Sequence, residues 1–228
     1  MQQQAFHLHV ALSFVESRKP VAALCRQAFQ EYAMLRDLVE RSRSIRRFQE
    51  KKPIAPEVLR DLVGHVRFIP SRANAQPLKY ILSSSSSLNA GIFQTLSWFG
   101  LDSHWRGPAE GERPSAYIVI VLDTELWDEA WSEAAIAAHT ILLGATEAGL
   151  GGALLTGIDR PRLKVELRLS DRYGVLFVVA LGQAGEEVRV ASTGSSHSLN
   201  RYRDEAGIAF VPKRSIDELI LAASPVDP

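Results

Sequence analysis

Residues 134–152 read AAIAAHTILLGATEAGLGG, and this stretch decides the class of fold. Ala134 to Ala148 is apolar nearly all round, within a helix expected over residues 127–150. A helix that is apolar on most faces is buried on most faces, so it is either the central core helix or a helix shared between the core and a subunit interface. The glycines 149, 151 and 152 follow this helix and precede a strand expected over 153–155. A dinucleotide-binding fingerprint needs the opposite order, so a Rossmann sheet is excluded.

The flanking sequence predicts a mixture of helices and strands that do not follow a strict strand–helix–strand order. Further strands are expected over residues 78–82, 117–122 and 175–181. Helices are expected over 56–68, 88–99 and 160–167, and 216–221 closes the pattern. The serine run 83–87 is expected to be a polar connector, and 184–208 to be polar and irregular. This arrangement predicts an α+β sandwich.

Composition narrows the class of protein. The 228 residues contain 26 Lys and Arg against 26 Asp and Glu, so the formal net charge is zero. A neutral chain has no overall attraction for nucleic acid or an anionic membrane. Cys25 is the single cysteine, which excludes an internal disulfide and indicates a reducing, cytoplasmic compartment. We see no apolar run of membrane-spanning length and no signal peptide.

The first 33 residues differ in character from those that follow. They show no clear period before a weak helical pattern near 21–32. We expect residues 1–33 to be an N-terminal extension, either an accessory helix or a poorly ordered segment, or the product of a start assigned upstream of Met34. The main domain is expected over residues 34–228.

A basic run offers a candidate anion site. Residues 41–52 contain six Lys or Arg in twelve positions. This run could be a solvated surface or a nucleic-acid patch, or it could bind phosphate, for which the planar guanidinium is well suited. Arg43, Ser44 and Arg46 are close enough in sequence to converge on one anion. Lys213 and Arg214 could add a second cationic contribution to the same phosphate.

Two loops could contact a planar ligand. The loop 70–77 reads PSRANAQP, and its Asn74 and Gln76 each offer donors and acceptors that suit the edge of a heterocycle such as flavin, although Pro, Ser and Asn are also ordinary turn residues. Gly157 follows Thr156 at the end of a strand, and glycine there permits close approach of the backbone to a ligand. Of the six histidines, His139 lies on the apolar helix and is expected to be packed or at an interface.

Together these segments resemble the nitroreductase family of FMN-dependent oxidoreductases. The matching segments occur in the family's order from about Met34 to Leu221. They are 43–48 (RSIRRF), 70–80 (PSRANAQPLKY), 134–152, 173–182 and 211–214 (VPKR). The loop 107–117 and the stretch 202–204 are similar to one subgroup. Ser42 departs from the pattern, because many members have an arginine there, and Thr156 replaces an acidic residue of some members.

The resemblance implies a three-layer sandwich with a mainly antiparallel central sheet, in an intertwined homodimer with FMN at the interface. Arg43, Ser44 and Arg46 would bind the phosphate and ribityl chain, and Arg214 with Lys213 would complete the phosphate site. The backbone of Leu155, Thr156 and Gly157 would face the flavin ring near N5. The partner subunit would supply Pro70, Ser71 and Asn74 of the loop, and Arg72 and Gln76 are further candidates for binding the cofactor.

The implied activity is ping-pong transfer of hydride from NADH or NADPH to the flavin and then to a small acceptor such as a nitroaromatic or quinone. No metal is implied, and no side chain is required as acid or base. Alternative readings are a specialised flavin chemistry, such as reductive dehalogenation or flavin fragmentation, a flavin-binding protein that does not turn over, and a basic nucleic-acid module.

Overall fold

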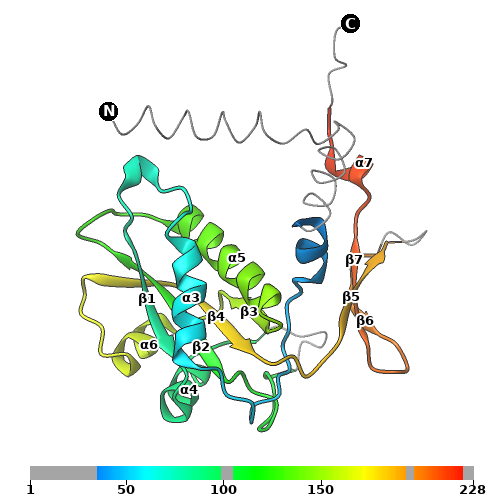
Figure 1. Ribbon diagram of the computed structural model, residues 1–228, viewed down its shortest axis with the longest axis horizontal. Helices are drawn as coiled ribbons and strands as arrows, with labels where there is room; N and C mark the ends of the chain where they lie inside the picture. Colours follow the sequence, from blue (N-terminus) through cyan, green and yellow to red (C-terminus); the bar gives the residue numbers. More distant parts are fainter. Residues whose placement is uncertain (1–34, 99–104, 194–197, 223–228) are drawn as a thin grey trace, which may run out of the picture. The chain divides into compact units, whose positions relative to one another are not determined.

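In the computed structural model, which describes residues 35–98, 105–193 and 198–222, a four-stranded antiparallel sheet forms the core (Figure 1). Its strands, in spatial order, are β1 (Leu78–Ser83), β2 (Ala116–Asp123), β4 (Tyr173–Gly182) and β3 (Gly151–Leu155). All three pairings are antiparallel. The two middle strands are almost wholly buried, because both faces of the sheet are covered.

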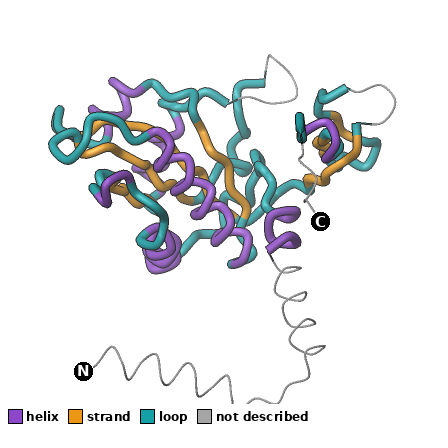
Figure 2. The backbone as a smooth tube through the Cα atoms, turned by 90° about the horizontal axis from the view of Figure 1, so that it is seen from above, coloured by secondary structure: helices purple, strands orange, loops and turns teal. Residues whose placement is uncertain are grey.

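Two layers of helices cover the sheet (Figures 1 and 2). The helices are α3 (Pro56–Val66) and α5 (Trp131–Glu147) on one face, and α4 (Ser86–Phe93) and α6 (Arg160–Glu166) on the other. Successive strand side chains point to opposite faces. Ile118 therefore packs with the first pair of helices and Val119 with the second. The predicted three-layer α+β sandwich is confirmed.

The helix ends follow local sequence signals. The side chain of Asp159 accepts a hydrogen bond from the Arg162 N–H at 3.1 Å, so it caps α6 as expected, and Pro161 lies in the first turn. Helix α4 starts at Ser86, inside the serine run that we expected to be a connector, and ends at Phe93 instead of near residue 99. Serine is favourable where a helix begins, so this run starts the helix.

A second, three-stranded sheet includes two strands within the segment 184–208 that we expected to be irregular. It consists of β5 (Val188–Ser192), β7 (Ala209–Lys213) and β6 (Tyr202–Arg203), in that order. The expectation for 184–208 was therefore wrong for β5 and β6. They are short and polar, and β5 pairs with a strand about twenty residues further along the chain, so local periodicity could not reveal them. Helix α7 (Ile216–Leu219) follows, with a Ser215–Glu218 capping box.

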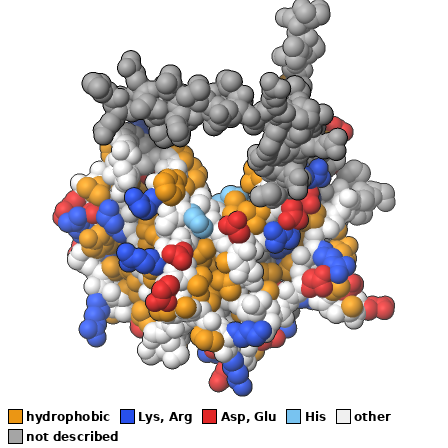
Figure 3. Space-filling view, viewed as in Figure 1, with side chains coloured by type: hydrophobic (Ala, Val, Ile, Leu, Met, Phe, Trp, Pro, Cys, Tyr) orange, Lys and Arg blue, Asp and Glu red, His pale blue; other side chains and the backbone are white. Residues whose placement is uncertain are grey.

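The chain divides into two compact units, residues 1–39 and 40–228. Residues 35–41 are helical. The predicted extension, residues 1–33, lies outside the described residues, so its expected boundary stays a prediction. On the face seen in Figure 3, Lys and Arg side chains are interspersed with Asp and Glu side chains.

An ion pair between a buried carboxylate and an exposed arginine fixes the end of β2. Asp123 is fully buried. Its carboxylate accepts two hydrogen bonds from the Arg172 guanidinium, at 2.8 and 2.6 Å. These bonds hold the pKa of the Asp123 carboxyl below its usual value, although burial acts in the opposite direction.

We predict that Arg172→Met destabilises the protein at pH 7 and flattens the dependence of its stability on pH. The folded-state pKa of Asp123 is lowered, so its contribution is complete above the unfolded-state value of about 4 and is lost as the pH falls below it. Urea unfolding between pH 7 and 3 measures both effects. Lys164→Met, which breaks the exposed 3.1 Å pair with Asp171, is the control and should cost less than about 1 kcal/mol. Equal losses in the two variants would contradict the assignment.

Candidate functional site

The basic segment 43–48 is held against the sheet by its two apolar residues. Ile45 and Phe48 are 8% and 2% exposed, while the residues between them are half-buried. The Ile45 N–H donates to the carbonyl of Gly152 at 2.9 Å, and Ser44 forms a parallel bridge with the same residue. The Phe48 N–H donates to the carbonyl of Glu112 at 2.8 Å. The segment therefore runs beside the start of β3, and its basic side chains point away from the core.

The backbone of Gly185 packs closely against the backbone of the basic segment. The Gly185 N–H donates to the Arg47 carbonyl at 2.8 Å. A Cβ atom on Gly185 would lie 2.9 Å from the carbonyl carbon of Phe48 and 3.0 Å from its oxygen. Only glycine fits there without displacing the basic segment.

A buried carboxylate, Glu186, orders the segment from the same side. Its Oε1 atom accepts hydrogen bonds from the N–H groups of Arg46 and Arg47, at 2.6 and 3.1 Å. Its Oε2 atom accepts a hydrogen bond from the Arg203 guanidinium. The Glu186 side chain is only 4% exposed. It therefore ties the basic segment to the strand β6.

The arginines around Glu186 carry more positive charge than this carboxylate neutralises. Burial, followed by the nearby charge of Arg201, lowers the pKa of Arg46 to about 10, and Glu186 acts in the opposite direction. Burial also lowers the pKa of Arg201, with Glu186 opposing it and Arg203 adding to it. The Nε atom of Arg201 is buried and has no hydrogen-bond partner. Three guanidinium groups around one carboxylate, one of them with an unused donor, fit a bound anion such as a phosphate.

The other residues predicted to bind the phosphate differ in their exposure and in their contacts. Ser44 accepts a hydrogen bond at its carbonyl from the Arg46 side chain, at 3.3 Å, and Arg43 is half-buried in the same segment. Lys213 and Arg214 are exposed at the end of β7, where Arg214 lies 3.4 Å from Glu218. Their role as phosphate ligands stays a prediction.

Glu186 and Arg201 were not among the residues predicted from the sequence to form the site. Glu186 gave no signal, because it is one acidic residue in a polar stretch that looked irregular. Arg201 directly precedes the 202–204 stretch that is similar to one subgroup. The pair Arg201 and Arg203, with one residue between them, was the only sequence signal for a further cationic contribution.

The strand β3 links the basic segment to the predicted ring-binding backbone. Gly152 lies beside Ser44 near the start of the strand, and pairing with β4 ends at Leu155. Thr156 is exposed immediately beyond that point, and the Gly157 carbonyl accepts a hydrogen bond from Ser97 at 2.8 Å. Thr156 is four positions beyond Gly152 along the chain, which corresponds to about 13 Å in an extended strand.

The loop 70–77 holds unusual backbone conformations. Ala73, Asn74 and Gln76 have φ values of 49°, 56° and 48°. Positive φ is uncommon outside glycine, and clusters of such residues are typical of functional sites. Within the loop, the Gln76 N–H donates to the Ser71 hydroxyl at 2.9 Å, and the Gln76 side chain donates to that of Asn74 at 2.9 Å.

Helix α5 supports this loop from its first turn. The Arg72 N–H donates to the carboxylate of Glu133 at 2.8 Å, and the Arg72 guanidinium stacks on Trp127 at 5.2 Å. Pro70, Arg72, Asn74 and Gln76 are exposed.

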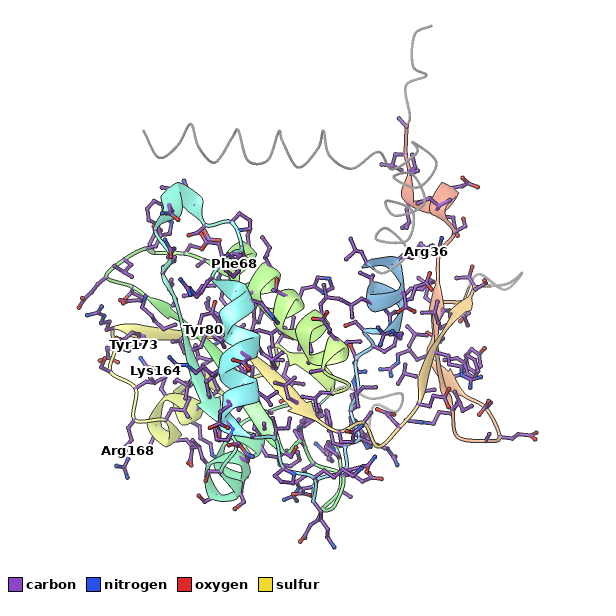
Figure 4. All side chains as sticks on the ribbon, viewed as in Figure 1. Arg36, Phe68, Tyr80, Lys164, Arg168 and Tyr173 are labelled. Atoms are coloured by element: carbon purple, nitrogen blue, oxygen red, sulfur yellow. The ribbon has the colours of Figure 1, made fainter. Side chains whose placement is uncertain are left out.

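Two pockets flank the loop, of about 320 and 370 Å³, and both are lined by Ser71 and Glu133. Tyr80 of β1 lines the first of them (Figure 4). Burial and the charge of Glu133 raise the pKa of the Tyr80 hydroxyl. The phenol therefore stays protonated near neutral pH. The loop thus presents ordered donors and acceptors beside two open pockets.

Some classes of site are not found in the described part of the chain. Residues 35–98, 105–193 and 198–222 contain no group of three or more His, Cys, Asp or Glu side chains that could hold a metal ion. Within the same residues, no helix has the length and apolarity needed to cross a membrane.

Comparison with known proteins identifies the fold. Residues 108–183 match the model of the nitroreductase family. The chain is similar to the FMN-dependent nitroreductase from Clostridium difficile R20291, at a TM-score of 0.57 and 21% identity. The match covers 74% of this chain and 97% of that one. It is also similar to a nitroreductase family protein from Streptococcus pneumoniae TIGR4, at a TM-score of 0.62 and 16% identity. This match covers 83% of this chain and 100% of that one.

A nitroreductase family protein from Clostridium novyi NT gives a TM-score of 0.55 at 24% identity, over 65% of this chain and 85% of that one. No curated protein matches the chain. The fold is the nitroreductase fold, and the resemblance to that family is confirmed.

We predict that Gly185→Ala destabilises the protein by about 1–3 kcal/mol, because the added methyl group meets rigid backbone. The control is Gly64→Ala in α3, where nothing lies within 4 Å of the new atom. There alanine should stabilise the helix by about 0.5–1 kcal/mol. Urea unfolding of the two variants measures the difference, and a harmless Gly185→Ala would show that the segment is not held as described.

Proposed function

We propose that this protein is an FMN-dependent oxidoreductase of the nitroreductase type that uses NADH or NADPH. The observation that carries the proposal is the excess positive charge around Glu186, on a chain with the nitroreductase fold. Arg46 and Arg201 are partly buried beside each other, and Arg201 has an unused donor. A site of this kind is suited to the phosphate end of a cofactor.

The residues of the basic segment would hold that phosphate end. Arg43, Ser44 and Arg46 would bind the phosphate and ribityl chain, with Arg201 as a further cation. Lys213 and Arg214 are proposed to complete the site. Glu186 would act as a positioning residue, since it binds the backbone of Arg46 and the side chain of Arg203.

The ring end would lie near the end of β3. The backbone of Leu155, Thr156 and Gly157 would face the flavin, and a backbone N–H needs no particular side chain at position 156. The loop residues Pro70, Ser71, Arg72, Asn74 and Gln76 would contact the ring from a second copy of the chain. Their backbone is already held in an ordered, strained conformation.

Bound FMN would supply the redox chemistry, taking a hydride from NADH or NADPH and passing reducing equivalents to a small acceptor such as a nitroaromatic or a quinone. The chain's own residues would bind and orient the two substrates in turn at one open face. The positive charge of the arginine cluster and a backbone N–H near the ring would favour a reduced, anionic cofactor.

The surface of α5 supports a homodimer. Its inner face is fully buried, with Ala134, Ala137, Ala138 and Ile141 at 0% exposure. Its outer face also carries large apolar side chains, of which Trp131 and Ile136 are 42% and 41% exposed. A second copy of the chain would bury this face and would bring the loop 70–77 to a flavin held by its partner.

The proposal is tested by reconstituting the purified protein with FMN, recording its spectrum, and adding NADH or NADPH without oxygen. We expect a bound flavin that bleaches with one or both donors and recovers with a quinone. A colourless protein that cannot be reconstituted would refute the proposal. A flavin that stays oxidised with both donors would instead indicate a flavin-binding protein without turnover.

Arg46→Gln sharpens this test. It removes a charge-assisted contact worth roughly 1.5–3 kcal/mol, so the affinity for FMN should fall by about tenfold or more, as measured by quenching of flavin fluorescence. The backbone N–H of residue 46 still reaches Glu186 in this variant. Arg60→Gln removes one exposed positive charge from α3 and is the matched control. Equal affinities in the two variants would place the phosphate elsewhere.

We predict that Ile136→Asp dissociates the dimer, because it places a charge in the apolar interface proposed on α5. Sedimentation velocity measures the change, and binding of FMN should weaken with it. Val165→Asp on α6 is the control, since Val165 is 79% exposed on a different surface. A dimer that survives Ile136→Asp, or a wild-type monomer, would contradict the proposed interface.

A further inference from the structure

A separate pocket lies beside α4, and none of the residues predicted to bind flavin lines it. Its volume is about 230 Å³. The walls come from three places in the sequence, namely residues 50–53, the region of α4 from 84 to 93, and the approach to β2 from 113 to 117. This volume lies below the roughly 300–1,000 Å³ that is usual for larger ligands, so any occupant is small.

Three of the residues that line the pocket carry a side-chain polar atom with no hydrogen-bond partner among the described residues. These groups are the hydroxyl of Tyr117, the hydroxyl of Ser115 and the Nε atom of Arg113. Tyr117 is 0% exposed and Ser115 is 8% exposed. Buried polar groups are nearly always paired, and leaving one unpaired destabilises the folded state. Three such groups lining one pocket indicate that something outside the chain completes their bonding.

The neighbouring polar residues do not supply the missing partners. The Asn89 side chain already accepts a hydrogen bond from Ser83 at 2.7 Å and donates one to the Ser115 carbonyl at 2.8 Å. The Glu50 carboxylate is bound to the N–H of Gly111 at 2.5 Å. These contacts shape the pocket wall, and none of them involves the three unpartnered atoms.

The balance of charge favours an anion. Arg113 and Lys51 are cationic and Glu50 is the lining carboxylate, so the wall carries one net positive charge. The Oε2 atom of Glu50 also accepts from the Arg113 N–H at 3.4 Å. Helix α4 adds the partial positive charge of its first turn, where Ser86 lines the pocket and Ser85 makes no side-chain cap.

The cation is held in place from one side by an aromatic ring. The Arg113 guanidinium lies over the Phe93 ring, 4.6 Å from its centroid. Burial and the charge of Glu50 raise the pKa of Tyr117, so its hydroxyl keeps its proton and remains a donor near neutral pH. The pocket therefore presents a fixed guanidinium and two hydroxyl donors.

We propose that this pocket binds a small molecule with an oxyanion, either a carboxylate or a phosphate, through Arg113, Ser115 and Tyr117. The site is independent of the proposed flavin chemistry, since it shares none of the residues assigned to FMN. Its occupant is recognised by the donors that the chain itself leaves unused.

The test is a titration of the FMN-reconstituted full chain with acetate and, separately, with inorganic phosphate, at constant ionic strength. The Nε–H signal of Arg113, identified by its absence in Arg113→Gln, is followed by ¹H–¹⁵N NMR. We expect it to shift and saturate with at least one of the two ions, and the ion that binds tells carboxylate from phosphate. A signal that moves with neither ion up to about 10 mM, well above a millimolar dissociation constant, would overturn the proposal.

Conservative variants distinguish a specific binding site from nonspecific association of the anion with the Arg113 guanidinium. Tyr117→Phe and Ser115→Ala should each weaken binding by about tenfold, because each removes a hydrogen bond to a charged group. Neither should lower the melting temperature without the ion, since the lost hydroxyl has no partner in the protein. Binding that both variants leave unchanged would be that of an adventitious ion only and would overturn the proposal.

Two controls complete the experiment. Arg60→Gln removes an exposed charge elsewhere and should leave the response of Arg113 unchanged. Arg46→Gln weakens the proposed flavin site, so an Arg113 response that persists in it shows that the two sites are distinct. A response lost in Arg46→Gln would assign the ion to the arginine cluster around Glu186 and overturn the proposal.

Discussion

The carboxylate of Glu186 is the charge on which the arrangement of the candidate flavin site depends. A carboxylate that is 4% exposed must be fully hydrogen-bonded to be tolerated. Two consecutive N–H groups and one guanidinium satisfy it, and these come from segments about 140 and 17 residues away. The same interaction therefore fixes the backbone of the basic segment and gathers the arginines of the second sheet. Removing the carboxylate would leave several cations close together without compensation.

The rest of the site follows from the sheet. The basic segment can lie beside β3 because glycines at 151, 182 and 185 admit its side chains and backbone at short distances. Once Ser44 is placed next to Gly152, the strand itself sets where Thr156 and Gly157 lie. In the proposed function, one rigid element would thus hold both the phosphate end and the ring end of the cofactor, which positions a ligand better than two independent loops would.

Helix α5 contributes both to the hydrophobic core and to the proposed dimer interface. It is apolar on both faces, as the sequence indicated, but one copy of the chain buries only the face that meets the sheet. Its first turn also holds the strained loop at Arg72 through Glu133. A partner that covers the outer face would stabilise this loop as well, so dimerisation and completion of the flavin site are coupled in the proposed function.

Much of the fold was predictable because its signals are local. The apolar strand at Tyr117, the proline and aspartate at the start of α6, and the order of helix, glycines and strand at residues 134–152 each specify an element from neighbouring residues alone. Element ends were less predictable. The serine run that starts α4 resembles a connector, and the strands β5 and β6 are short, polar and paired only through β7.

By itself, the sequence determined that the chain is a neutral α+β protein with a basic segment, an Asn- and Gln-containing loop and a strand end suited to close approach, in the order of one family. Only the tertiary structure decided which charges meet. It placed Glu186 and Arg201 at Arg46, and it brought Arg113, Ser115 and Tyr117 together with their donors unused. The physical reason is that pairing and desolvation of charge depend on distances across the fold, which neither the type of a residue nor its spacing along the chain specifies.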